Sequence, residues 1–321
     1  MDRKLSKESA KGLGKRLGKE SYKGLGKAAI ESTMYISHRS AAEMYGVSAL
    51  DLILANSPGI TQQDDLTDVS FTGHARRRWT KGMRMYSSEN IPAKGSILLY
   101  RGQAVASPEL LFLQMAKKLD IQRLILLGLQ ICAHPPGKPS EALSTAKKIR
   151  DFIDNASGCH GHNRAARAAQ YLADGSGSAL ESLAFMVITL PPALGGYGLR
   201  GGVFNHEVIL DKAAQKQLGQ DRCFVDIFFK KAAVAVEYQS LSYHATAAEQ
   251  GKDFIRASLL ERMGIGVMQL STIQLYNRDA CNVFVHNLAK RLGHRMQIRA
   301  SGFEDMHTKL RALLPTSSGI A

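Results

Sequence analysis

The clearest pattern of apolar positions lies between residues 223 and 238, where two short apolar runs flank a pair of lysines. The runs CFVDIFFK and AVAVEY are rich in β-branched and aromatic residues. Runs of this length and composition predict two buried strands, and Lys230 with Lys231 between them predicts a tight turn. Each strand carries one acid, Asp226 in the first and Glu237 in the second.

The segments around these strands alternate between helical and extended patterns. ALESLAFMVITL predicts a helix, VFNHEVIL a strand, residues 246–263 a long helix and GIGVMQLS a further strand. Two more helices are expected at about 279–292 and 302–314. The order helix, three strands, helix, strand predicts an α/β sandwich over residues 178–314, with a small mixed sheet covered on both faces.

A different pattern precedes this region. SHRSAAEMYG, within residues 31–60, predicts a short helical module capped by Ser37 or Ser40. Alternating segments over residues 66–107 predict a small antiparallel sheet.

The remainder of the amino-terminal half is predicted to be helical. SPELLFLQMAKKL begins with a serine and a proline ahead of an apolar repeat, a typical helix start, and IQRLILLGLQICA is apolar around most of its circumference, as a buried helix is. Two further helices, at about 141–155 and 163–173, lead to the linker DGSGS at 174–178. Residues 31–173 are therefore expected to form a mixed α+β region.

Composition adds a strong charge. The 321 residues contain 42 Lys and Arg against 28 Asp and Glu, a net charge of +14, with a hydrophobic content of 45% that is normal for a globular core. This charge favours a polyanionic partner such as nucleic acid or an acidic membrane surface, although base composition in the source genome also raises the isoelectric point.

The charge is concentrated in the first 30 residues, which repeat one unit as KESAKGLGK and KESYKGLGK. Nine basic and three acidic residues give this segment a net charge of +6, and its frequent glycines disfavour a helix. It is expected to be a mobile basic arm that contacts phosphates without reading sequence, or a solvated tail with no dedicated partner.

No run of roughly 18 apolar residues is present, and the first residues lack an apolar signal core, so we expect a cytoplasmic protein without a membrane span. Four scattered cysteines without a CxxC pair favour free thiols. CHGHN at 159–163 favours a polar surface loop over a zinc site, because no second ligand pair has suitable spacing.

The two acids on the predicted strands are the main chemical clue. An isolated buried charge is costly, and two carboxylates at neighbouring strand positions repel each other unless a cation lies between them. Mg²⁺ prefers oxygen ligands of this kind. Asp226 and Glu237 therefore predict a magnesium site or the remnant of one.

Residues 178–314 resemble the restriction-endonuclease-like superfamily with the PD-(D/E)XK core, and more narrowly its branch similar to the very-short-patch-repair (Vsr) endonuclease. The resemblance is carried by the order of elements and by residues at motif positions, namely Glu181, Asp226, Glu237, His244, Asp253 and Arg256. It implies a DNA endonuclease that uses Mg²⁺, with Mn²⁺ as a possible substitute.

The resemblance also implies roles for these residues. Asp226 and Glu237 would hold the cation, with Glu181 as a further ligand directly or through water. His244 would act as general base or hold the scissile phosphate, and Arg256, oriented by Asp253, would neutralise charge at that phosphate.

Gln239 departs from the pattern, because many relatives have an acid or a lysine two residues after the strand glutamate. Glutamine carries no charge, so it ligates Mg²⁺ less strongly than aspartate and stabilises an anionic nucleophile less well than lysine. Some active nucleases of the wider superfamily also have glutamine there, so Gln239 remains a candidate catalytic residue.

The amino-terminal half more loosely resembles the corresponding part of AbiEi-type antitoxins and regulators, which implies DNA contact in a defence or toxin–antitoxin setting. Arg76, Arg77 and Arg78 form a candidate phosphate contact, or equally a solvated loop, and Lys230 and Lys231 are further candidate nucleic-acid contacts.

Three functions are thus open. The leading one is a Mg²⁺-dependent endonuclease whose basic amino-terminal half docks DNA. The alternatives are a non-catalytic DNA-binding regulator or antitoxin that retains a nuclease-like scaffold, and a protein-interaction module that does not bind DNA.

Overall fold

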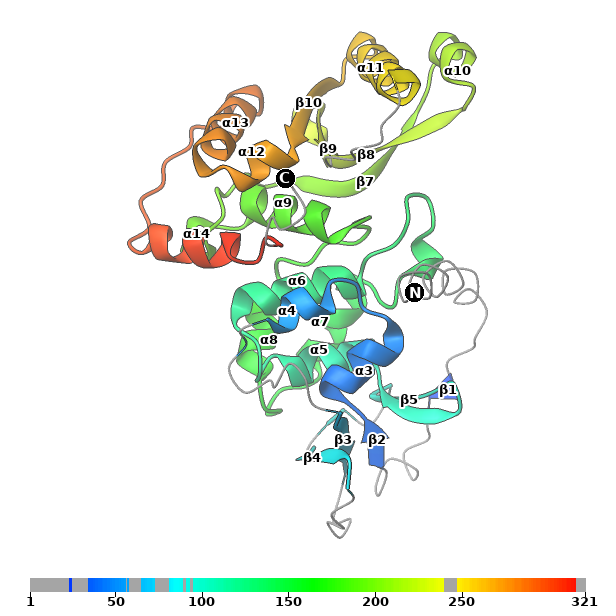
Figure 1. The fold of residues 1–321 in the computed structure, drawn as a ribbon, viewed down its shortest axis with the longest axis vertical. Helices are drawn as coiled ribbons and strands as arrows, with labels where there is room; N and C mark the ends of the chain where they lie inside the picture. Colours follow the sequence, from blue (N-terminus) through cyan, green and yellow to red (C-terminus); the bar gives the residue numbers. More distant parts are fainter. Residues whose placement is uncertain are drawn as a thin grey trace, which may run out of the picture. The chain divides into compact units, whose positions relative to one another are not determined.

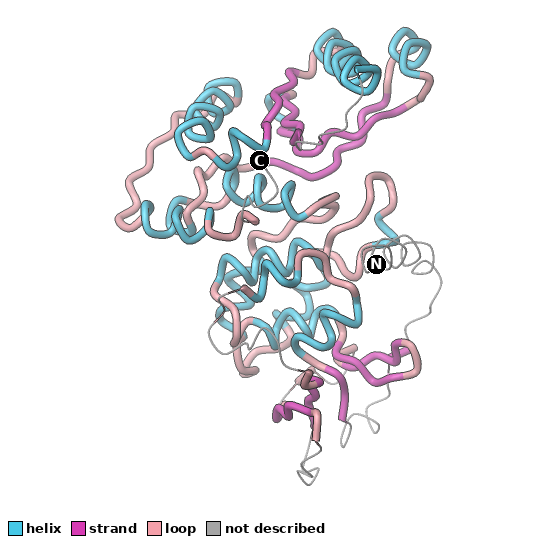
Figure 2. The backbone as a smooth tube through the Cα atoms, viewed as in Figure 1, coloured by secondary structure: helices cyan, strands magenta, loops and turns pink. Residues whose placement is uncertain are grey.

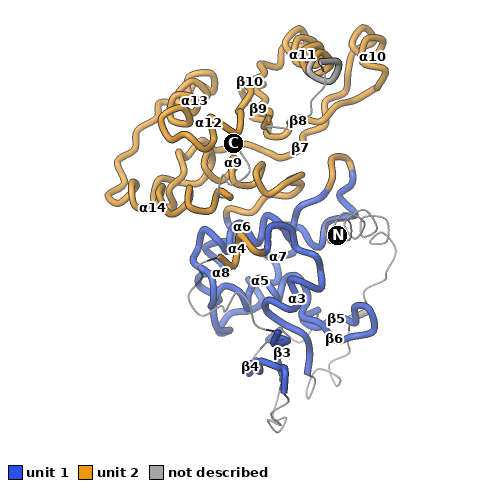
Figure 3. The backbone as a smooth tube through the Cα atoms, in the orientation of Figure 1, with its two compact units in different colours: residues 1–50, 56–134, 138–170 blue, residues 51–55, 135–137, 171–321 orange. Residues whose placement is uncertain are grey.

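A computed structural model describes residues 23–24, 34–55, 57, 65–72, 81–88, 91–92, 95–239 and 247–315. The chain divides into two compact units, which are coloured separately in Figure 3. Unit 1 comprises residues 1–50, 56–134 and 138–170, and unit 2 comprises residues 51–55, 135–137 and 171–321. The main division falls at residues 170–171, shortly before the glycine- and serine-rich linker.

Unit 1 contains a six-stranded sheet in the order β1-β5-β6-β2-β3-β4. The strands are β1 (Lys23–Gly24), β2 (Met34–Ile36), β3 (Thr67–Phe71), β4 (Met83–Ser87), β5 (Ile97–Tyr100) and β6 (Gln103–Ala106). The expected sheet is present, but it is mixed: β3 pairs in parallel with β4 and β2 with β6, whereas the remaining pairs are antiparallel. Alternation of apolar residues identifies strands without specifying their direction, which explains why the sequence did not predict these parallel pairs.

The helices of unit 1 follow the predicted order. They are α3 (His38–Tyr45), α5 (Pro108–Met115), α6 (Ile121–Ile131), α7 (Ala146–Asp154) and α8 (His162–Ala169), with a 3₁₀ turn at Pro139–Glu141. Ser107 caps α5 by accepting a hydrogen bond from the Leu110 amide, as its position before Pro108 predicts. Helix α6 is buried along most of its length, which confirms the prediction of a buried helix.

Unit 2 contains a four-stranded mixed sheet in the order β10-β9-β8-β7. Its strands are β7 (Gly202–Ile209), β8 (Arg222–Phe229), β9 (Val234–Gln239) and β10 (Gly266–Ser271). Strands β7, β8 and β9 pair antiparallel, and β10 pairs in parallel with β9. The predicted α/β class with a small mixed sheet is confirmed, and a 3₁₀ turn at Lys230–Ala232 joins β8 to β9.

Helices cover this sheet on both sides. Figure 1 shows α10 (Lys212–Leu218) and α11 (Ala247–Arg262) on one side and α9 (Ala179–Thr189) on the other. One core joins the strands to α10 and α11 through Val208, Val225, Phe228, Ala235, Ala214, Leu259 and Leu260. On the opposite side the rings of Phe185 in α9 and Phe204 in β7 lie 4.3 Å apart.

The carboxy-terminal helices complete unit 2 and are drawn as cyan coils in Figure 2. They are α12 (Thr272–Tyr276), α13 (Arg278–Arg291) and α14 (Phe303–Arg311), and a 3₁₀ turn lies at Pro192–Leu194. Helix α4 (Leu50–Leu54) is a single short turn in the amino-terminal half of the sequence. None of the helices in the described ranges has both the length and the apolar character needed to span a membrane.

Candidate active site in the carboxy-terminal unit

Asp226 lies where the ladder between β8 and its neighbours is interrupted. The β8–β9 pairing covers Ile227–Phe229, and the β7–β8 pairing skips Asp226 and the residue opposite it, Asn205. The Asp226 carboxylate accepts a hydrogen bond from the backbone amide of Tyr238 at 2.7 Å. A side chain thus supplies the acceptor at a position where the two strands do not form a regular pair, and this holds the carboxylate beside β9.

Asn205 lies opposite Asp226 in β7 and has an unusual backbone conformation. Its φ of 42° lies in the left-handed region, which asparagine tolerates better than most residues other than glycine. Its side-chain amide donates to the Gly175 carbonyl at 2.5 Å. Strand β7 is therefore linked to the segment that precedes α9, the helix whose first turn carries Glu181.

Glu237 occupies β9 beside this interruption and pairs in register with Gln269 of β10. The residue is 8% exposed, and its Oε2 accepts a hydrogen bond from Arg256 Nη2 of α11 at 3.0 Å. Its other oxygen, Oε1, is buried and has no hydrogen-bond partner among the described residues. Since buried polar atoms are nearly always paired in native proteins, this oxygen can accept a further donor or ligate a cation.

The electrostatics of the two acids are coupled. Burial, followed by repulsion from Asp226, raises the pKa of Glu237 to about 7. Burial, followed by the charge of Glu181, raises the pKa of Asp226 to about 6, although the Tyr238 amide and Arg256 oppose this change. Near neutral pH, full ionisation of both acids is therefore opposed by the other acidic charges around them.

Glu181 lies in the first turn of α9, whose N-cap Ser178 accepts a hydrogen bond from the Glu181 amide. The Glu181 carboxylate accepts a hydrogen bond from the Gly177 amide at 2.9 Å, so it is fixed at the helix start. It is close enough to act on the pKa of Asp226. However, no three His, Cys, Asp or Glu side chains in the described ranges form a ready-made metal-binding group.

Gln239 and the two lysines of the hairpin lie at opposite ends of β9. Gln239 is exposed at the end of β9, where its carbonyl accepts a hydrogen bond from Thr272. Lys230 and Lys231 are exposed in the turn of the hairpin, at the opposite end of β9 from Gln239. His244, Arg76, Arg77 and Arg78 lie outside the described residues.

Arg256 differs from its expected arrangement. The sequence predicted that Asp253, three residues earlier on the same helix, would orient it, but the guanidinium forms an ion pair with Glu237 and also donates to the Phe224 carbonyl at 3.3 Å. Asp253 raises the pKa of Glu237 through its charge. Arg256 therefore compensates Glu237 inside the site in this structure.

The residues at the site fit a divalent cation through a small number of protein ligands. Asp226 and Glu237 provide oxygen donors, their negative charges oppose each other, and Glu237 Oε1 lacks a partner. Magnesium sites commonly use one or two carboxylates and fill the remaining positions with water and phosphate oxygens. A pair of carboxylates is thus sufficient, and Glu181, which raises the pKa of Asp226 after burial, adds to the negative charge around it.

Sequence reasoning did not identify Asn205 or Tyr238 as parts of this site. The available sequence signal for Asn205 was an asparagine inside an apolar strand pattern. Its position opposite Asp226 follows from the strand pairing. Tyr238 acts through its backbone amide, which leaves no trace in the residue type. Its hydroxyl lies 2.9 Å from that of Thr272, so the same residue also links β9 to α12.

Comparisons with models of known protein families, with curated proteins and with solved structures found no match to this chain. The resemblance to the PD-(D/E)XK superfamily and to AbiEi-type proteins therefore stays a prediction from the motifs. The geometry of the described residues carries the functional argument below.

Proposed function

We propose that the carboxy-terminal unit is a divalent-metal-dependent DNA endonuclease with its site at Asp226 and Glu237. The observation that carries this proposal is a buried pair of carboxylates whose charges oppose each other while Glu237 Oε1 lacks a partner. Asp226 and Glu237 would hold a divalent cation, whose charge would offset their repulsion and give the open oxygen a partner. Nucleic acid as the substrate is supported by the net charge of +14.

Asp226 and Glu237 would hold the cation, which when bound polarises a phosphodiester oxygen and lowers the pKa of water. The Tyr238 amide keeps the Asp226 carboxylate oriented toward the site. Arg256 donates from Nη2 to Glu237 and from Nη1 to the Phe224 carbonyl, so moving Nη2 from Glu237 to a substrate phosphate would neutralise negative charge there. His244 and Gln239 remain the proposed candidates for positioning water.

Plasmid cleavage tests this proposal. Purified protein is incubated with supercoiled DNA and Mg²⁺ or Mn²⁺, and Asp226→Asn and Glu237→Gln are expected to reduce the cleavage rate at least a hundredfold. Glu261→Gln, which changes an exposed glutamate on α11 in the same way, is the matched control and should cut like the wild type. Absence of cleavage by the wild type, or equal cleavage by all variants, would overturn the proposal.

A second candidate is a non-catalytic DNA-binding regulator that keeps this fold as a scaffold. The observation that favours it is the ion pair between Arg256 and Glu237, which already compensates one carboxylate, together with the uncharged Gln239. This function predicts DNA binding that falls with salt but is unchanged by EDTA and by Glu237→Gln. A gel-shift titration with and without EDTA, beside the plasmid assay, separates the two functions.

Weak binding to duplex DNA even at low salt would contradict both candidates. Such a result would instead favour the protein-interaction module, because both DNA-dependent functions require contact with phosphates. The titration therefore uses a low-salt arm as its first condition, and the EDTA comparison is made where binding is strongest.

A further inference from the structure

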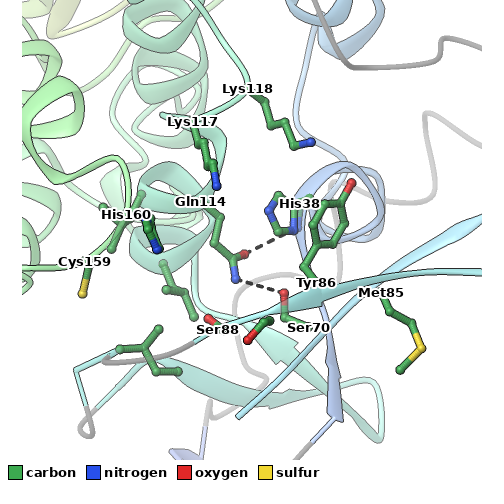
Figure 4. A pocket seen from close by; sticks show the side chains of 14 residues that line it. His38, Ser70, Met85, Tyr86, Ser88, Gln114, Lys117, Lys118, Cys159 and His160 are labelled. Carbon is green, nitrogen blue, oxygen red and sulfur yellow. Dashed lines mark hydrogen bonds between the residues drawn. The ribbon is translucent and has the colours of Figure 1, made fainter. Parts of the chain in front are cut away.

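Unit 1 contains a cavity of about 400 Å³ that lies outside the candidate active site. Its walls come from β3, β4, the start of α3, the end of α5 and the residues before α8. A volume of this size falls within the range that holds small ligands in proteins. Figure 4 shows the side chains that line it.

Basic side chains dominate the charge of this cavity. Lys117 and Lys118, directly beyond α5, line it together with His160, and no Asp or Glu is among the described lining residues. The Lys118 ammonium lies 5.1 Å from the centre of the Tyr86 ring, so the lysine is directed over an aromatic side chain of the same cavity. The buried Asp68, which accepts a hydrogen bond from the Tyr86 hydroxyl at 3.5 Å and interacts with Lys118, also pairs with Arg84. The two lysines therefore remain the charged side chains that line the cavity itself, and they suit an anionic group.

The opposite wall is a buried network of hydrogen-bonding groups. Gln114 donates from its amide nitrogen to the hydroxyls of Tyr35 and Ser70, at 3.1 and 3.4 Å, and Tyr35 donates to Ser88 at 2.8 Å. Figure 4 places the Gln114 amide between the lysines and the two serines. Hydroxyl groups that already have one bond keep further donor or acceptor capacity, so this wall can bind the polar part of a ligand.

His38 adds a strained aromatic position. Its φ of 48° is in the left-handed region, which is unfavourable for a residue with a Cβ atom. Its ring stacks on Tyr86 at 3.9 Å. Burial, followed by the charges of Lys118, Arg84 and Lys117, lowers the pKa of His38 to about 3, so the ring is neutral and the surrounding field is positive. Residues held in such conformations gather at functional sites.

Apolar residues complete the cavity. Met85, Ile91, Leu110 and Leu113 line it beside the polar groups. A cavity that combines apolar walls with two lysines and a hydrogen-bonding wall recognises a ligand with both an apolar body and an anionic group. Inorganic phosphate would contact the lysines and the hydrogen-bonding groups but not the apolar wall.

We propose that this cavity binds a small organic anion of up to mononucleotide size, with a ring against the apolar wall and an anionic group beside Lys117 and Lys118. The anionic group is a phosphate or a carboxylate, since lysine binds both. This site is independent of the carboxylates of unit 2, and its occupation requires no metal.

Binding is measured with the full chain by isothermal titration calorimetry in EDTA, using phenyl phosphate, benzoate, AMP, adenosine and inorganic phosphate as probes. At least one ring-bearing anion should bind, and it should bind at least tenfold more tightly than inorganic phosphate. If AMP is that ligand, adenosine should also bind at least tenfold more weakly. Phenyl phosphate against benzoate identifies the preferred anionic group.

Two matched double variants locate the binding. Lys117→Ala with Lys118→Ala should weaken it at least tenfold, whereas Lys147→Ala with Lys148→Ala, an adjacent lysine pair on α7 outside the cavity, should leave it unchanged. Equal effects of the two double variants, binding of no ring-bearing anion, or preference for duplex DNA over every small anion would overturn the proposal. None of these outcomes depends on whether the protein cuts DNA.

Discussion

Glu237 is the residue whose ionisation connects the structure to measurable stability. Its pKa of about 7 in the folded protein lies above the ordinary value of 4.5, mainly because of burial and then because of Asp226. The folded state therefore binds a proton more strongly than the unfolded state does. This contribution to stability is fully present below about pH 4.5 and is lost as pH rises through about 7.

Between pH 5 and pH 8 the free energy of unfolding of unit 2 should fall, and Glu237→Gln should remove on the order of 2 kcal/mol of that fall. Hydrogen exchange of the β8 and β9 amides, measured across this pH range, reports the stability of the region directly. Glu261→Gln is the control and should keep the wild-type slope; an unchanged slope in Glu237→Gln would contradict the assignment.

Metal addition tests the same residue in another way. At pH 8 both acids tend to be ionised, so Mg²⁺ or Mn²⁺ that binds the folded site should stabilise the protein according to its concentration relative to the dissociation constant. We expect the thermal midpoint of the wild type to rise with added Mn²⁺ and that of Glu237→Gln to respond much less. The same rise in both proteins would place the metal elsewhere.

Helix α11 is linked to the sheet by the ion pair of Arg256 with Glu237. The side chain of Arg256 is 28% exposed and that of Glu237 is 10% exposed. Removing one partner of a largely buried pair leaves the other charge uncompensated. Arg256→Ala should therefore destabilise unit 2 by on the order of 2 kcal/mol at pH 8 and by less at pH 5, where Glu237 is protonated.

Arg262 on the same helix supplies the matched comparison. It pairs with Asp211 at 2.7 Å, but both side chains are nearly half exposed, at 46% and 47%. Solvent screening limits such pairs, so Arg262→Ala should destabilise the protein less than Arg256→Ala does. Urea denaturation of both variants at the two pH values measures the difference. Equal losses would show that burial of the Arg256 pair does not set its contribution.

The sequence predicted those elements whose patterns are local. The strands around Asp226 and Glu237 are marked by β-branched and aromatic residues, and α9 by its apolar run; the structure adds the Ser178 cap. Two short helices were missed, α10 with its Asp211 cap and α12 with the capping box of Ser271 and Gln274. Their 7 and 5 residues are too few to establish a helical period.

In the candidate site, too, the contacts set by local sequence were predicted and those set by tertiary packing were not. That Asp226 and Glu237 lie near each other follows from a hairpin, because residues on paired strands are close when the turn is short. The ion pair of Glu237 with Arg256 and the bond from the Tyr238 amide depend on how α11 packs and where the strand ladder stops. Neither contact is encoded in a local sequence pattern. The sequence therefore could not predict that Arg256 pairs with Glu237, although Asp253 was expected to orient it.

The positive charge of the chain is unevenly distributed, and its amino-terminal part can be tested for DNA binding separately from the rest. The first 22 residues contain seven basic and three acidic side chains, a net charge of +4 out of +14. They precede β1 (Lys23–Gly24), which pairs with β5, so their deletion keeps the residues of both strands. Deleting residues 1–22 therefore tests how most of the basic arm of residues 1–30 contributes to DNA binding, while β1 is kept.

Deleting residues 1–22 should weaken binding to duplex DNA and reduce its dependence on salt. Each phosphate contact contributes about 0.9 to the slope of log K against log salt, so losing several lysine contacts should lower the slope by roughly 2–4. Fluorescence anisotropy with a labelled duplex from 50 to about 200 mM salt measures both quantities. Deleting residues 316–321, which carry no charged side chain, is the control and should change neither. An unchanged slope after the amino-terminal deletion would show that the arm is a solvated tail, and that phosphate contacts come from basic residues elsewhere in the chain.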